Sequence, residues 1–136
     1  MSRREFEWIV KQEKIRAILS LTETPLDPEW TKQLVYYKNI QVPNHKAPTV
    51  EQLKEAVKFL EENVVLKNKV LVHCAAGKGR TGTVLAAYLC ERQEMSPNDA
   101  IAKIRSQRHG SVEKNSGQEE AVFQFAKFLQ SHEQKK

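Results

Sequence analysis

Residues 73–82, His-Cys-Ala-Ala-Gly-Lys-Gly-Arg-Thr-Gly, constrain the fold more than any other stretch of this 136-residue chain. The apolar run before it, residues 70–72, is typical of a buried strand, and the pattern of residues 83–90 predicts a helix. Glycines at positions 77, 79 and 82 let the backbone turn tightly between the two elements. Backbone N–H groups in such a turn point inward, and the following helix adds its positive dipole end. The stretch therefore predicts an anion-binding loop.

A cysteine opens this loop and an arginine closes it. Cys74 lies where a thiol loses its proton readily, because cations and a helix N-terminus stabilise the thiolate. Arg80 brings a planar fork of donors that matches two oxygens of a phosphate. A thiolate, an anion cradle and an arginine together indicate phosphoryl transfer through a cysteinyl-phosphate intermediate. The alternative is a glycine turn with a buried, inert cysteine. The order of residues 77–81 excludes the nucleotide-binding P-loop.

This loop resembles the Cys-x5-Arg signature of the cysteine-dependent protein tyrosine phosphatase superfamily. Its fuller form, His-Cys-x-x-Gly-x-Gly-Arg-Thr-Gly, is similar to that of small, atypical dual-specificity phosphatases. The resemblance covers nearly all of the chain from residue 15 and includes residues 100–105, 110–112 and 118–119. It implies a single phosphatase domain over residues 1–136. Such phosphatases usually begin with one or two extra strands, and here these are candidates for absence because a helix is predicted almost at residue 1.

Strand and helix patterns alternate along the chain, which predicts an α/β fold. Strands are expected at residues 15–20, 36–42 and 70–72, and helices at 5–14, 28–34, 50–63, 80–91, 97–108 and from 116 or 118 to 129. Thr49 and Ser96 are expected to cap two of these helices. Residues 131–136 are expected to be a frayed tail. Pattern and resemblance together predict a mainly parallel central sheet of four to five strands with helices on both faces.

The roles of the loop residues follow from the chemistry and from the resemblance. Cys74 attacks phosphorus, and Thr81 donates its hydroxyl to the sulfur, which must leave as a thiolate in the second step. The equatorial phosphate oxygens are expected to be held by the backbone N–H groups and the closing side chain of one segment: Ala75, Ala76, Gly77, Lys78, Gly79 and Arg80.

Two further polar residues are candidates for a supporting role. His73 is expected to orient the loop by hydrogen bonding, with a plain end-of-strand histidine as the alternative. The resemblance implies that Gln118 positions the hydrolytic water. A solvated polar residue at a helix start is the alternative that the pattern favours.

The residue that should act as general acid is missing. In the family this acid is an aspartate four residues before the proline that corresponds to Pro48, and here Asn44 occupies that position. An amide cannot donate a proton as an acid, and positioned acid catalysis is worth about 10²–10⁴-fold. His45 is the alternative acid, although a surface loop histidine is the simpler interpretation. The remaining interpretations are a substrate with a good leaving group and a protein that only binds phosphorylated partners.

The expected substrate is a phosphoprotein carrying phosphotyrosine, with phosphoserine and phosphothreonine as further candidates. The short chain leaves little sequence for the long loops that deepen a tyrosine-only pocket. Lys78 resembles the extra loop lysines of phosphoinositide phosphatases, although it is equally a solvent-facing lysine at a permissive position. The alternative functions are therefore a phosphoinositide or RNA 5′-triphosphate phosphatase, and a phosphate-binding pseudo-phosphatase.

Composition limits the partners. The net charge of +5 favours acidic partners, but no block of basic residues suggests a nucleic-acid arm. No apolar run approaches the ~18 residues of a membrane span. Cys74 and Cys90 are too far apart along the predicted helix to form a disulfide, so a reducing, cytoplasmic location is expected. The spacing of the four histidines offers no metal site, and no cofactor is expected.

Overall fold

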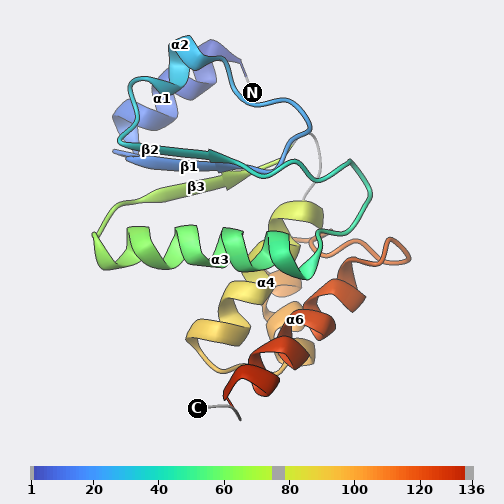
Figure 1. The fold of residues 1–136 in the computed structure, drawn as a ribbon. Coiled ribbons are helices and arrows are strands. Elements are labelled where there is room, and N and C mark those ends of the chain that lie inside the picture. Colours follow the sequence, from blue (N-terminus) through green and yellow to red (C-terminus); the bar gives the residue numbers. More distant parts are fainter. Residues whose placement is uncertain (1, 75–78, 134–136) are drawn as a thin grey trace.

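The computed structural model describes residues 2–74 and 79–133 (Figure 1). Helices and strands alternate through its first half, and helices alone follow the last strand. The elements are α1 (Arg3–Gln12), β1 (Ala17–Ser20), α2 (Pro28–Thr31), β2 (Tyr36–Asn39), α3 (Val50–Val65), β3 (Val70–His73), α4 (Gly79–Arg92), α5 (Pro97–Gln107) and α6 (Gln118–Glu133).

The strands form one parallel sheet in the order β2-β1-β3. Ala17 of β1 lies opposite Tyr36 on one side and Val70 on the other, which sets the register. Every residue of β1 is buried, as expected for the central strand of a sheet with both faces covered. Because all three strands point the same way, the loops after them meet at one edge of the sheet, near the start of α4 (Figure 1).

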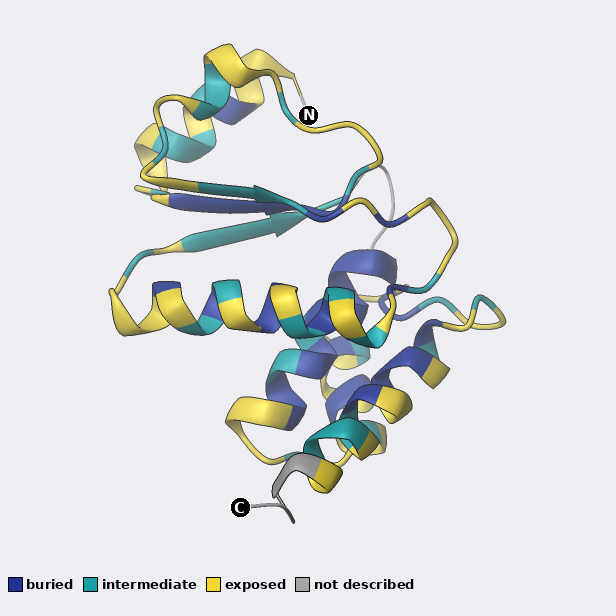
Figure 2. Cartoon of the chain, in the orientation of Figure 1, coloured by how far each residue is buried: buried dark blue, intermediate teal, exposed yellow. Residues whose placement is uncertain are grey.

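Helices cover both faces of the sheet (Figure 1). Helices α1 and α2 lie on one face, where Phe6 is fully buried and its ring centroid is 5.6 Å from that of Trp30. Helix α3 and the group α4, α5 and α6 lie on the other. The main core gathers buried side chains from β1, α3, α4 and α6, including Leu19, Leu53 and Phe125. Figure 2 shows this burial as a dark face on each packed helix and exposed residues on the outer face.

The helix starts follow the capping residues of the sequence. Thr49 and Gln52 form a complete capping box before α3, and Ser96 accepts a hydrogen bond from the backbone of Asp99 before α5. Ser2 caps α1 in the same way, which moves the start of that helix to Arg3 from the predicted residue 5.

The fold class is confirmed, but the predicted number of strands is wrong. The described residues form three strands, at the three positions where the sequence has strand patterns, and not the four to five that the resemblance implied. Strand β2 ends at Asn39 instead of residue 42 because β1, its pairing partner, ends at Ser20. Helix α6 runs to Glu133, so the predicted tail from residue 131 is helical in its first part.

Candidate active site

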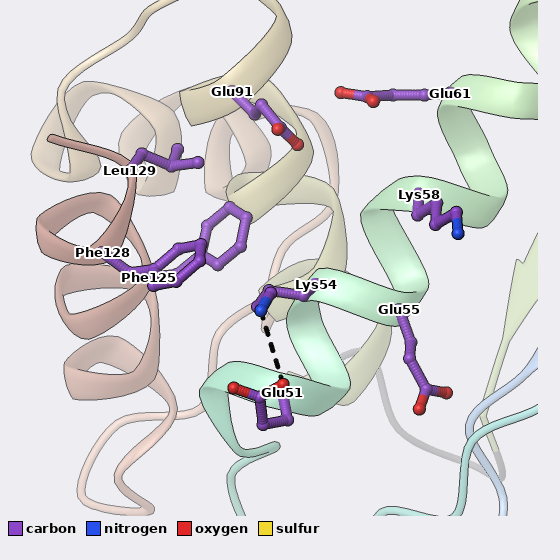
Figure 3. A pocket seen from close by; sticks show the side chains of 9 residues that line it. All are labelled: Glu51, Lys54, Glu55, Lys58, Glu61, Glu91, Phe125, Phe128 and Leu129. Carbon is purple, nitrogen blue, oxygen red and sulfur yellow. Dashed lines mark hydrogen bonds and ion pairs between the residues drawn. The ribbon is translucent and has the colours of Figure 1, made fainter. Parts of the chain in front are cut away.

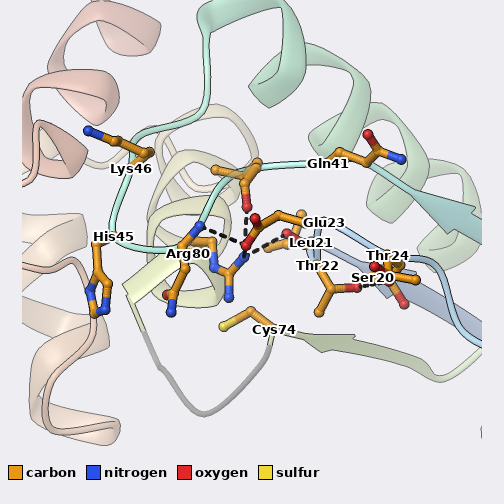
Figure 4. Close-up of polar contacts among 12 residues, drawn as sticks. Ser20, Leu21, Thr22, Glu23, Thr24, Gln41, His45, Lys46, Cys74 and Arg80 are labelled. Carbon is orange, nitrogen blue, oxygen red and sulfur yellow. Dashed lines mark hydrogen bonds and ion pairs between the residues drawn. The ribbon is translucent and has the colours of Figure 1, made fainter.

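Cys74 follows β3 directly, at the carboxyl end of a parallel strand, where open α/β sheets bind their ligands. The Thr81 hydroxyl, in the first turn of α4, donates a hydrogen bond of 3.2 Å to the Cys74 sulfur. Such a bond stabilises negative charge on the sulfur. Figure 4 shows this sulfur and the Arg80 guanidinium directed toward the same space. The predicted phosphate-binding positions Ala75, Ala76, Gly77 and Lys78 lie outside the described residues.

The Arg80 side chain is only 3% exposed and is fixed by the ends of two strands. Its Nη1 atom donates to the backbone carbonyls of Leu21, at 3.3 Å, and Val42, at 2.7 Å. The Glu23 carboxylate lies 4.0 Å from the same nitrogen (Figure 4). These contacts set the position of the guanidinium before any phosphate arrives, which lowers the ordering cost of binding.

A cavity of about 240 Å³ joins the start of α4 to the loop after β2. Its lining brings together three residues that the sequence predicted for the site, Asn44, His45 and Arg80, with Gln118 as a fourth. Gly79, Gly110 and Glu113 complete it. The loop at residues 43–48 therefore lies beside the site arginine, as its strand order requires.

Gln118 is fully buried, so the interpretation of a solvated residue at a helix start is wrong. Its side-chain oxygen accepts hydrogen bonds from the Glu113 backbone, at 2.7 Å, and from the Thr83 hydroxyl, at 3.4 Å. Its side-chain nitrogen donates to the Lys46 carbonyl at 3.0 Å. One amide thus connects α4, the loop after β2 and the loop before α6. Gly79 is required here, because a Cβ atom on it would come within 2.5 Å of the Gln118 oxygen.

His73 is bonded across the sheet to the neighbouring strand. Its Nε2 atom lies 2.6 Å from the Ser20 hydroxyl, which accepts from the Tyr37 hydroxyl at 2.9 Å. Because Tyr37 uses its hydrogen on Ser20, we assign Ser20 as donor to a neutral His73 ring. Burial lowers the pKa of His73, and nearby positive charge, including Arg80, lowers it further. His73 is therefore neutral near pH 7 and is a poor proton source there.

Two carboxylates near the site escaped the sequence analysis. Glu23 accepts a hydrogen bond from the Asn44 backbone at 3.1 Å, and Glu113 contacts His45 Nδ1 at 3.0 Å. Glu23 follows β1 in the chain, so the rule that parallel strands deliver ligand-binding residues at their carboxyl ends was the one available signal. Glu113 lies in a loop between two helices, and no sequence pattern marks it.

A larger cavity of about 360 Å³ lies between α3 and α6 and shares no lining residue with the site (Figure 3). Phe125, Phe128 and Leu129 of α6 form its apolar side, and charged residues of α3 form the other. Cys90 is buried and unpaired, and burial raises the pKa of its thiol to about 11. The described residues contain no cluster of three or more histidine, cysteine or acidic side chains suited to a metal ion. None of the helices in the described ranges is long and apolar enough to span a membrane.

We predict that Gly82→Ala destabilises the fold. An added Cβ atom would lie 2.5 Å from Ser111 Cβ and 3.0 Å from its Cα. Alanine normally gains about 1 kcal/mol over glycine in a helix, but overpacking of this kind costs about 1–3 kcal/mol. We expect the free energy of unfolding, measured with urea, to fall by about 1 kcal/mol. The same change in a Ser111→Gly background should cost less, and equal costs in the two backgrounds would contradict this packing argument.

The comparisons with known proteins define the class. Residues 3–122 match the family model PTP-SAK, described as a Swiss Army Knife protein, DSP-PTPase phosphatase domain. The chain therefore belongs to the PTP-SAK family, within the dual-specificity branch of the protein tyrosine phosphatases, and the expectation raised by the loop sequence is confirmed.

Curated relatives cover most of this chain but are longer. Human phosphatidylglycerophosphatase and protein-tyrosine phosphatase 1 is 31% identical over 112 residues, which are 74% of this chain and 56% of that protein. The dual specificity protein phosphatase Mpk3 of Drosophila melanogaster is 32% identical over 102 residues, 73% of this chain and 24% of that protein. The chain thus spans little more than half of the one relative and about a quarter of the other.

Solved structures share the fold over nearly the whole chain. Tk-PTP in its active form has a TM-score of 0.84 at 32% identity, covering 93% of this chain and 86% of that one. PTPMT1 also has a TM-score of 0.84, at 27% identity, covering 98% of this chain and 90% of that one. A second PTPMT1 structure, in complex with PI(5)P, matches at 26% identity with a TM-score of 0.81 and covers 96% of this chain and 88% of that one.

Proposed function

We propose that the chain hydrolyses phosphotyrosine in proteins through a cysteinyl-phosphate intermediate, with phosphoserine and phosphothreonine as further substrates. The observation that carries this proposal is the Thr81 hydroxyl bonded to the Cys74 sulfur in the helical turn that also holds Arg80. This arrangement supplies a nucleophile, a donor for the departing thiolate and a fork for phosphate oxygens.

The reaction proceeds in two steps. The Cys74 thiolate attacks phosphorus, an S–P bond forms, and the ester oxygen leaves with a proton. Water then attacks the cysteinyl phosphate, the S–P bond breaks, and inorganic phosphate leaves while the sulfur regains its electron pair. Arg80 holds the equatorial oxygens in both steps, and its buried position lets it stabilise their charge more strongly than a solvated arginine could.

A phosphorylated lipid headgroup is the second candidate substrate. The human relative is named for both phosphatidylglycerophosphate and protein-tyrosine activity, and a structural neighbour was solved with PI(5)P. The net charge of +5 also favours a polyanionic headgroup. Lys78, the loop lysine that suggested this substrate class, lies outside the described residues.

A side-by-side assay tests both candidates. The chain is incubated with phosphotyrosine peptides, phosphoserine and phosphothreonine peptides, phosphoinositide and phosphatidylglycerophosphate vesicles, and 5′-triphosphate RNA, and phosphate release is measured. We expect kcat/KM to be highest on phosphotyrosine peptides. A higher value on either lipid would replace the protein substrate by the headgroup, and no release from any substrate or from p-nitrophenyl phosphate would leave a phosphate-binding protein.

We predict that Asn44→Asp accelerates phosphotyrosine turnover at mildly acidic pH. Asn44 lines the cavity beside Arg80, so a protonated carboxyl there could reach the leaving oxygen. Positioned acids contribute about 10²–10⁴-fold, and a loosely placed one should recover up to about tenfold. The gain should fade as pH rises and the carboxyl ionises, and it should be smaller on p-nitrophenyl phosphate, whose leaving group needs little protonation. Identical pH–rate profiles for both proteins would exclude position 44 from proton transfer.

A further inference from the structure

His45 sits in a tight turn whose ends are fixed. The Lys46 backbone N–H donates to the Pro43 carbonyl at 3.0 Å, which closes the turn, and His45 has a φ angle of 62°. This left-handed conformation is uncommon for residues other than glycine and persists where the surroundings impose it. Here Glu23 binds the Asn44 N–H and Gln118 binds the Lys46 carbonyl, at 3.1 and 3.0 Å. The turn therefore presents the imidazole in one backbone geometry.

The imidazole is also held by a carboxylate from another part of the chain. His45 Nδ1 lies 3.0 Å from both side-chain oxygens of Glu113, a contact between residues 68 positions apart. With Nδ1 facing the carboxylate, Nδ1–H is the donor, and Nε2 is the ring nitrogen that remains for a second partner. The two side chains are 71% and 40% exposed, so this pair contributes little to stability, and its value lies in ring orientation.

The buried amide of Gln118 fixes both members of the pair. Its oxygen binds the Glu113 backbone N–H at 2.7 Å, and its nitrogen binds the carbonyl of Lys46, the neighbour of His45. Three segments of the chain thus converge on the His45 ring. His45, Glu113, Gln118 and Arg80 line the same cavity of about 240 Å³, so the oriented imidazole shares its space with the phosphate-binding arginine.

The charged groups around the His45 ring come from every segment that packs against this cavity. Glu113 approaches from the loop before α6, Arg80 from α4, Glu23 from the loop after β1 through the Asn44 backbone, and Lys46 is the adjacent residue in the chain. Glu113 is the group in direct contact among those described. Its negative charge favours the imidazolium form, which is the form that can give a proton away.

We propose that His45 is the general acid of this site and that Glu113 is its positioning residue, so that the pair replaces the aspartate missing at position 44. This inference rests on the proposed function, because it supplies the proton which that reaction consumes. It also gives Gln118 a role in holding the acid, in addition to any contact with water.

The proton balance closes over the two chemical steps. As the Cys74 sulfur bonds to phosphorus and the P–O bond breaks, the His45 imidazolium passes its Nε2 proton to the leaving oxygen and becomes neutral. In the second step the neutral imidazole takes a proton from the attacking water, the S–P bond breaks, and the imidazolium and thiolate are restored. Glu113 stays ionised throughout and keeps the ring in orientation.

Leaving-group dependence and pH–rate profiles test the pair. We compare the parent chain, His45→Ala, Glu113→Gln and Glu113→Asp on phenyl phosphate and p-nitrophenyl phosphate. Phenolate, with a pKa near ~10 as in tyrosine, needs the acid much more than nitrophenolate does. We expect His45→Ala to lower kcat on phenyl phosphate by about 10²-fold and on p-nitrophenyl phosphate by a far smaller factor. Glu113→Gln should move the alkaline limb of the phenyl phosphate profile to lower pH, and Glu113→Asp should restore part of it.

Two matched controls separate this role from a structural one. His109→Ala and Glu120→Gln change the same residue types at exposed positions outside the cavity and should leave both rates unchanged. Equal losses on the two substrates in the His45 and Glu113 variants, or no loss at all, would overturn the pair as acid while turnover by the parent, abolished by Cys74→Ser, keeps the proposed function. Absence of any Cys74-dependent turnover would refute both.

Discussion

Cys74→Ser should abolish turnover while phosphate binding survives. A serine hydroxyl at this position remains protonated near neutral pH, so the Thr81 hydroxyl would face a neutral oxygen instead of a thiolate. Loss of the nucleophile costs on the order of 10⁶-fold in a well-studied serine hydrolase, and here we expect a loss of at least about 10³-fold in kcat on p-nitrophenyl phosphate. Vanadate or phosphate binding, measured by calorimetry, should stay within a few-fold of the parent because Arg80 is intact.

Cys90 provides the matched control for this experiment. It is the second cysteine of the chain, buried in the cluster between α4, α5 and α6, and burial keeps its thiol protonated. Cys90→Ala should therefore retain turnover, and iodoacetamide should inactivate the parent and Cys90→Ala at the same rate. If Cys74→Ser keeps more than a few per cent of the parent activity, a covalent intermediate on this sulfur is excluded.

Arg80→Lys should be nearly as damaging as loss of the nucleophile. Lysine keeps the positive charge but loses the planar fork that can bind carbonyls and phosphate oxygens at the same time. In this structure one guanidinium nitrogen already serves the carbonyls of Leu21 and Val42. A single ammonium must leave these carbonyls in order to reach phosphate. We expect kcat/KM to fall at least about tenfold, equivalent to about 1.4 kcal/mol of transition-state stabilisation, and the melting temperature to fall as well.

Arg105→Lys separates the two effects of that change. Arg105 also donates to two backbone carbonyls, those of Ser111 and Val112, but it does not line the cavity at Cys74 and Arg80. Its replacement should lower the melting temperature and change kcat/KM on p-nitrophenyl phosphate much less than Arg80→Lys does. Equal kinetic losses in both variants would assign the Arg80 effect to packing and remove Arg80 from the phosphate clamp.

Local rules predicted most of the elements because each has a local cause. The capping residues Thr49 and Ser96 fix helix starts, and the apolar run before Cys74 fixes β3. The strand count failed where it rested on the resemblance instead of on residues. The three strands of the described chain are those that the pattern itself marked.

The site was predictable only where the chain order carried the information. Cys74, Arg80 and Thr81 lie in one continuous loop, so their spacing was enough to propose their roles. Glu23 and Glu113 come close to the site only through tertiary contacts. Gln118 was misjudged for the same reason, because a polar residue at a helix start gives no sign that two loops will enclose it.

The contacts of Arg80 have a consequence for how the site appears during folding. Its two carbonyl partners lie 59 and 38 positions earlier in the chain, so the guanidinium reaches its final place only when β1, the loop after β2 and the start of α4 have docked together. Contacts between distant residues form late, because loop closure must precede them. During synthesis or refolding, phosphate-binding competence should therefore appear after most helical structure. Such a delay keeps a reactive thiol without its phosphate clamp until the domain is assembled.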